Sequence, residues 1–140
     1  MTYHFGVMQR QRFHAMSCTV GTALALAATG CWGNPVQRKL TGRWIGEGVE
    51  NVRDDALAAA TGWARGASLE FAGRFVTVSI PAEQPRSAKY QVVSAEGRNI
   101  ELKVLRQDGG TDPLELVLDD EHRIRWVVGD GQAIVMRRER

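Results

Sequence analysis

Apolar and polar residues alternate in short runs over residues 41–140, and turn residues separate the runs. Val76, Val78 and Ile80, for example, are spaced two apart with polar residues between them. A period of two is typical of half-buried antiparallel strands. The pattern predicts eight strands, at residues 42–50, 67–72, 74–80, 88–95, 99–106, 113–119, 122–128 and 132–138.

The segment between the first two predicted strands has helical character instead. Asp54 and Asp55 offer an N-cap and an acidic first turn, residues 56–64 are rich in alanine, and Gly66 follows as a stop signal. The helix should lay one apolar face against the sheet. That face comprises Leu57, Ala60 and Ala64, with Trp63 beside it.

Consecutive short strands joined by tight turns form a meander, and such a sheet removes its exposed edges by closing on itself. We therefore predict an all-β fold with one short helix: an antiparallel, up-and-down barrel of eight strands, with the helix between strands 1 and 2. Eight strands enclose an interior that side chains fill or that holds one small ligand. The sequence leaves both possibilities open.

The N-terminal segment has the layout of a secretory signal. Residues 1–16 are polar and carry Arg10 and Arg12, and residues 17–30 are apolar or small without a charge. The apolar stretch is shorter than the roughly 20 residues that a membrane-spanning helix needs. The sequence therefore predicts a signal peptide over residues 1–30.

The apolar stretch ends in small residues at 28–30 that lead directly into Cys31. This resembles the lipobox of bacterial lipoproteins, in which the cysteine becomes the acylated first residue of the mature chain. The alternative is ordinary cleavage near residues 25–27, which would leave Cys31 as an unpaired thiol in an oxidising compartment, because Cys18 leaves with the signal. Acylation is the favoured interpretation.

The resemblance implies a membrane anchor at Cys31, a short tether over residues 31–40 and a barrel domain over residues 41–140. Trp32, next to the cysteine, lacks the acidic character associated with inner-membrane retention. We therefore expect a lipid-anchored protein of the bacterial cell envelope, at the outer membrane and facing the periplasm.

The charges argue against a nucleic-acid partner. The chain has 18 Lys and Arg against 16 Asp and Glu, but Arg10 and Arg12 are the only charges before residue 31. Beyond the signal, basic and acidic residues are therefore equal in number. Such a domain lacks the basic footprint of a nucleic-acid binder.

Gly42-Arg43-Trp44 opens the first predicted strand as a Gly-x-Trp motif, and the last strand ends in Met136-Arg137-Arg138. This resembles the lipocalin superfamily, and most of all its short bacterial lipoproteins, over about residues 41–138. The resemblance implies that Trp44 lies on the barrel floor beneath an arginine of the last strand. Either Arg137 or Arg138 can take that place.

A ligand inside the barrel would contact Trp44, Gly46, Gly48, Tyr90 and Trp126. The two glycines share the parity of the tryptophan in the first strand, so they remove volume from the face that it occupies. They could equally let the strand bend around a small barrel.

Candidates for catalysis are weak. His122 follows three acidic residues, but one histidine with turn carboxylates does not supply a zinc site. Glu47 and Glu50 are three apart, which predicts opposite faces of a strand. No nucleophile elbow, phosphate loop or dinucleotide motif is present in the sequence. We expect no catalytic residue, metal or cofactor.

Two functions remain. In the first, the barrel binds a small apolar or lipid-like molecule. In the second, the barrel is filled and the protein is an interaction or inhibitor module for an envelope protein. The exposed connection over residues 81–86, which two prolines stiffen, would then be the recognition loop.

Overall fold

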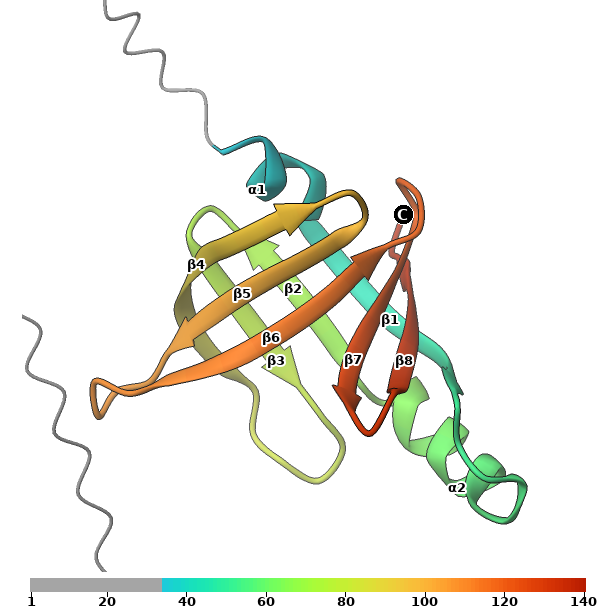
Figure 1. Ribbon diagram of the computed structural model, residues 1–140. Coiled ribbons are helices and arrows are strands. Elements are labelled where there is room, and N and C mark those ends of the chain that lie inside the picture. Colours follow the sequence, from blue (N-terminus) through green and yellow to red (C-terminus); the bar gives the residue numbers. More distant parts are fainter. Residues whose placement is uncertain (1–33) are drawn as a thin grey trace, which may run out of the picture. The chain divides into compact units, whose positions relative to one another are not determined.

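The computed structural model describes residues 34–140. The predicted signal peptide and Cys31 lie outside the described residues. Ten elements follow one another along the chain (Figure 1): α1 (Pro35–Leu40), β1 (Gly42–Glu50), α2 (Asp54–Arg65), β2 (Ser68–Ala72), β3 (Phe75–Ser79), β4 (Arg86–Glu96), β5 (Asn99–Leu105), β6 (Thr111–Leu118), β7 (Arg123–Gly129) and β8 (Gln132–Arg138).

The strands form one closed antiparallel barrel in the order β1 to β8, and β8 pairs with β1 to complete it. The predicted eight-stranded up-and-down barrel with a helix between strands 1 and 2 is thereby confirmed. The two helices lie at opposite ends of the barrel (Figure 1).

A single apolar cluster fills the centre of the barrel. Its largest fully buried members are Trp44, Phe71 and Leu40, all at most 1% exposed. Every strand contributes to it, because inward-facing positions recur along each strand with a period of two. Burial of this cluster is the main source of stability for the domain.

Residues 35–40 form a helix where we expected a tether. Asn34 caps α1, accepting a hydrogen bond from the amide of Val36 at 2.9 Å, and Pro35 occupies the first turn, where no amide donor is needed. Leu40 is fully buried, so the packed domain begins at α1 and not at residue 41.

Helix α2 spans nearly the predicted range but is attached differently. Its N-cap is Arg53, with no side-chain capping bond, so the expected N-cap at Asp54 was wrong. Ala64 is buried, whereas Leu57 and Trp63 are 42% and 41% exposed. The expected apolar face against the sheet was therefore wrong for these two residues: the helix packs by its C-terminal end and projects from the barrel (Figure 1).

Three irregularities interrupt the alternation of the strands. The register shifts between Gly46 and Gly48 in β1, between Val92 and Ser94 in β4, and between Val127 and Gly129 in β7. An extra residue in one strand reverses which face the following residues occupy.

Candidate functional site

The α1 end of the barrel is closed by the pairing of Arg138 with Trp44. The Arg138 guanidinium carbon lies 4.2 Å from the centre of the buried Trp44 ring, and the indole Nε1 donates a hydrogen bond to the Leu40 carbonyl at 2.9 Å. Arg137 lies elsewhere, where its Nε pairs with Glu47 at 3.1 Å. Of the two candidate arginines, Arg138 is the one that covers the tryptophan.

Three backbone carbonyls accept hydrogen bonds from the Arg138 guanidinium: Lys39 at 2.6 Å, Glu121 at 2.8 Å, and Thr41. Gly42 passes directly beneath this side chain at a φ of +121°, a conformation that favours glycine. The Gly-x-Trp motif and the last strand therefore form a structural clasp between α1, β1, β8 and the β6–β7 turn.

The three aromatic residues that we expected around an interior ligand are part of the apolar core or adjoin it. Trp44 and Tyr90 are buried in the core, and Trp126 packs against it. The Tyr90 ring meets Phe71 edge-on with centroids 5.4 Å apart, and its hydroxyl donates to the Gly73 carbonyl at 3.3 Å. Burial raises the pKa of the Tyr90 phenol above its ordinary value.

Gly46 faces inward, but the space beside it is occupied. A Cβ at this position would come within 1.8 Å of the Ala64 carbonyl oxygen, and the Gly46 amide donates to the Ala67 carbonyl at 3.0 Å. The glycine therefore lets the end of α2 pack directly on β1. Neither of the two expected reasons, a ligand cavity or strand bending, alone explains why residue 46 is a glycine.

Gly48 does not share the face of Trp44, so that expectation was wrong. The bulge after Gly46 pairs Gly48 with Val135, which alternates with the buried Ile134 and Met136. A Cβ on Gly48 would meet nothing within 4 Å. The bulge thus turns Gly48 outward.

The same bulge places Glu47 and Glu50 on one face, which corrects the expectation of opposite faces. Glu47 pairs with Arg137 and lies 4.0 Å from Arg123, and Glu50 lies 3.5 Å from Arg125. Arg123 and Arg125 are two apart in β7 and so share its outer face. Both carboxylates form ion pairs on the barrel wall.

An apolar depression in the described residues lies at the α2 end. We call it the α2 groove. It has a volume of about 350 Å³, open to solvent, between α2 and the β7–β8 hairpin. Its lining residues are Val49, Val52, Ala60, Trp63, Val128, Gln132, Ala133 and Ile134.

The β-bulge in β7 contributes to the α2 groove by turning Val128 outward. Val128 is 49% exposed, although simple alternation with Ile124 and Trp126 places it inside. Trp63 stands opposite on the projecting helix. Sequence reasoning missed this site because a bulge leaves no mark in the alternation. Val128 continues the apolar alternation of Ile124 and Trp126 up to Gly129, the last residue of β7, so no local signal marks its outward position.

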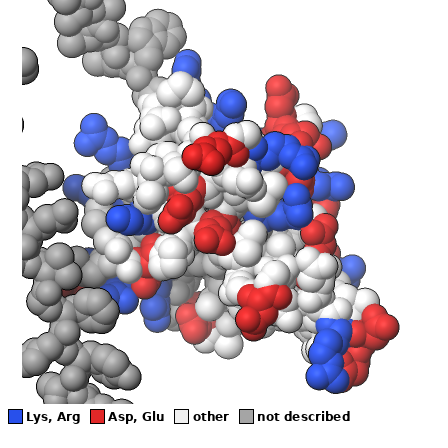
Figure 2. Space-filling view, in the orientation of Figure 1, with Lys and Arg blue, Asp and Glu red and all other residues white. Residues whose placement is uncertain are grey.

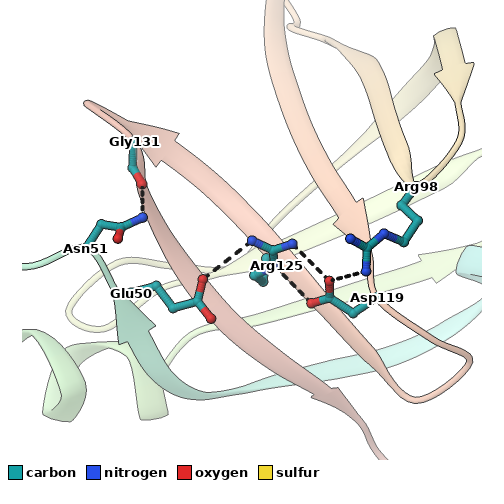
Figure 3. A network of polar contacts seen from close by, with 6 residues as sticks. All are labelled: Glu50, Asn51, Arg98, Asp119, Arg125 and Gly131. Atoms are coloured by element: carbon teal, nitrogen blue, oxygen red, sulfur yellow. Dashed lines mark hydrogen bonds and ion pairs between the residues drawn. The ribbon is translucent and has the colours of Figure 1, made fainter.

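A polar network holds the rim of the α2 groove in place (Figure 3). Asn51, at a φ of 59° directly after β1, donates to the Gly131 carbonyl in the β7–β8 turn at 2.8 Å. This bond ties the chain that leads into α2 to the hairpin opposite. The two walls of the groove are thus joined at one edge.

The other half of the network joins β7 to two turns at the α1 end. Arg125 makes a two-pronged contact with Asp119, with both distances 2.9 Å, and Arg98 approaches the same carboxylate at 3.5 Å (Figure 3). Hydrogen bonding to Asp119 raises the pKa of Arg125, against the opposing effect of burial. The network stabilises the barrel wall.

His122 lies in the β6–β7 turn, where its backbone amide donates to the Asp120 carboxylate at 2.7 Å. Within residues 34–140 no group of three or more His, Cys, Asp or Glu side chains is placed to hold a metal ion. Nor does any helix in this part of the chain have the length and apolar character to cross a membrane.

Comparison with known proteins adds no relative. No protein-family model, no curated protein and no solved structure matches the chain. The lipocalin and lipobox resemblances stay predictions from the sequence.

Proposed function

We propose that the protein is an envelope lipoprotein, anchored through acylated Cys31, whose barrel domain binds a small apolar or lipid-like molecule in the α2 groove. One observation supports the binding site above all: Trp63 and Val128 expose 41% and 49% of their surfaces on the walls of one apolar depression. Large apolar side chains gathered in a concave site are typical of ligand pockets.

The volume and chemistry of the groove fit a modest ligand. Its volume of about 350 Å³ is at the lower end of the roughly 300–1,000 Å³ usual for small-molecule sites. No Lys, Arg, Asp or Glu lines it, and the Gln132 amide is its one polar side chain. A ligand would therefore place an uncharged apolar part inside and leave any charged group in solvent.

The packed interior argues against a ligand within the barrel. Trp44, Leu102 and Met136 are fully buried there and belong to one continuous cluster. A ligand in the interior would have to displace such side chains, whereas the groove is already open. The projecting helix makes this site accessible without rearrangement of the strands.

The binding site can be tested with an uncharged apolar dye, N-phenyl-1-naphthylamine, whose fluorescence rises in apolar surroundings. We expect saturable binding to the wild type and its loss in Ala60→Leu, which fills the groove. Ala58→Leu makes the same change on the exposed surface of α2, away from the lining residues, and should bind normally. Equal binding by both variants would reject the groove as the site.

The anchor has its own test. Expression of the full chain in a bacterial host should yield a mature protein that begins at Cys31 and carries acyl chains, detected by intact mass. Cys31→Ser should abolish both processing and acylation. Membrane fractionation should then recover the wild type with the outer membrane. An unmodified thiol at Cys31 would exclude the anchor but leave the groove untouched.

The filled core also supports a second candidate, an interaction or inhibitor module. The loop at residues 81–86 is exposed from Ala82 onward, and Pro81 packs on Gly66, where an added Cβ would meet its Cγ at 2.7 Å. Such a loop on a rigid scaffold suits contact with an envelope protein. Crosslinking from Gln84 in whole cells tests this candidate, since a discrete partner that is lost on changing residues 82–85 would favour it.

A further inference from the structure

The end of the barrel that carries α1 bears basic side chains without ion-pair partners. Arg38 and Lys39 lie in the last turn of α1, Arg74 in the β2–β3 turn, and Lys89 in β4 beside Phe75. All four are exposed, and within the described residues none of them forms an ion pair. We call these four residues the basic rim.

The register of the strands shows that the basic rim lies at one end. Gly42, the first residue of β1, pairs with Phe71 near the end of β2, so the β2–β3 turn lies beside the start of β1 and α1. Phe75 pairs with Lys89 across β3 and β4 directly after this turn. Figure 2 shows Lys and Arg side chains at the top of the visible face, where α1 lies in Figure 1.

The segments that form the basic rim contain no acidic residue. Residues 31–46, 71–82 and 84–95 lack Asp and Glu altogether. The acidic residues at this end lie outside these segments. Asp119 in the β6–β7 turn is paired with Arg98 and Arg125, and Glu139 after β8 is paired with Arg43. Glu96 is the last residue of β4. The four residues of the basic rim therefore lie on segments without acidic side chains, whereas Arg43 and Arg98 at the same end are paired with carboxylates.

An exposed aromatic ring accompanies the charges. Phe75 is 48% exposed on the outer wall next to the β2–β3 turn, and the Lys89 ammonium nitrogen lies 6.0 Å from its ring centre. A phenyl ring flanked by Lys and Arg is typical of surfaces that contact the interface of a phospholipid bilayer.

The short stretch of chain between Cys31 and α1 supports the same partner. Asn34 precedes α1, and two residues separate it from Cys31. At about 3.5 Å per extended residue, an anchor at Cys31 would hold the α1 end within roughly 10 Å of the bilayer. This is about one Debye length at physiological salt, so charges on the basic rim would feel the membrane surface potential.

We propose that the basic rim and Phe75 bind an anionic phospholipid surface and orient the barrel with α1 toward the bilayer. This inference rests on the anchor in the proposed function. Helix α2, which lines the α2 groove, lies at the opposite end of the barrel (Figure 1), so this orientation places the groove at the end away from the membrane. The ligand would then enter from the aqueous side and not directly from the bilayer.

The test uses the full chain with Cys31→Ser, so that acylation plays no part. Binding is measured by co-sedimentation with phosphatidylcholine vesicles with and without phosphatidylglycerol. The N-terminal segment, with Arg10 and Arg12, is the same in every variant, so differences between variants report on the barrel domain alone. We expect binding that depends on phosphatidylglycerol and weakens as salt increases.

Two double variants separate the basic rim from charge in general. Arg38→Gln/Arg74→Gln should weaken the phosphatidylglycerol-dependent binding by about tenfold or more. Arg65→Gln/Lys103→Gln removes the same charge from α2 and β5 and should change it by less than about threefold. Equal losses in both variants, or equal binding to both vesicles, would overturn the proposal. Neither result would bear on acylation of Cys31, which intact mass reports separately.

Discussion

The Arg138 guanidinium lies 4.2 Å above the centre of the Trp44 ring and donates to the backbone carbonyls of Lys39, Thr41 and Glu121. One side chain from the last strand thus closes the barrel over the first strand and holds α1 in place. Because the stacked cation also satisfies three carbonyls, no other residue type can replace it fully.

Arg138→Ala should therefore destabilise the domain. Loss of the stacking interaction and of three charged hydrogen bonds should lower the free energy of unfolding by about 2 kcal/mol or more. Arg137→Ala is the matched control. It removes a side chain that is 68% exposed and should cost less than about 1 kcal/mol. Urea denaturation measures both, and equal costs would show that the clasp contributes nothing beyond an ordinary surface arginine.

Gly46→Ala should be far more disruptive than Gly48→Ala. The first places a Cβ 1.8 Å from the Ala64 carbonyl oxygen, so α2 or β1 must shift. Overpacking of this kind costs about 1–3 kcal/mol. The second meets nothing within 4 Å and should change stability by no more than about 0.5 kcal/mol. Thermal unfolding measures both variants, and the reverse order of stability would contradict the packing of Gly46 against α2.

Stability should decline at alkaline pH through Tyr90. Its pKa in the folded protein is raised above the ordinary 10.0 by burial, so the folded state keeps the phenol proton longer than the unfolded state does. The associated stability is complete below about pH 10 and is lost as the pH rises through the folded value. The wild type should therefore lose more stability than Tyr90→Phe between about pH 9 and 11. Parallel urea midpoints for the two proteins would contradict this prediction.

Glu101 and Glu115 pair directly across β5 and β6, and both are exposed. Like charges in such a pair are destabilising, so Glu115→Lys should raise the free energy of unfolding by roughly 0.2–1 kcal/mol. Glu70→Lys provides the opposite case, because Glu70 pairs with Arg43 across β1 and β2. It should lower stability by a similar amount. Chemical denaturation at low salt measures both effects, and a Glu115→Lys protein less stable than the wild type would refute the prediction.

The barrel itself could be predicted from the sequence because its strands alternate strictly over most of their lengths. Each of the eight strands begins and ends within two residues of the range expected from alternation. Turn residues indicated where the hairpins lie, and the alanine content of residues 56–64 indicated helix α2. These signals depend only on neighbouring residues, so they can be recognised in the sequence without knowledge of the tertiary structure.

The groove could not be predicted, because it depends on two features without a local signal. The bulge at Val128 reverses the facing of an apolar residue, and α2 projects because its C-terminal end packs on Gly46. On α2, Ala64 is buried and Trp63 is exposed, and this difference depends on where the rest of the chain packs against the helix. Similarly, we expected Gly48 to face inward like Trp44, but one extra residue in β1 after Gly46 turns it outward.

The most direct test of the central claim is native mass spectrometry of the full protein after exposure to a lipid extract of its own host. Our account predicts one discrete added mass on the wild type and on Ala58→Leu. The same mass should be absent from Ala60→Leu, whose added side chain fills the α2 groove. A bare wild-type protein, or a ligand that Ala60→Leu retains, would contradict binding at this site.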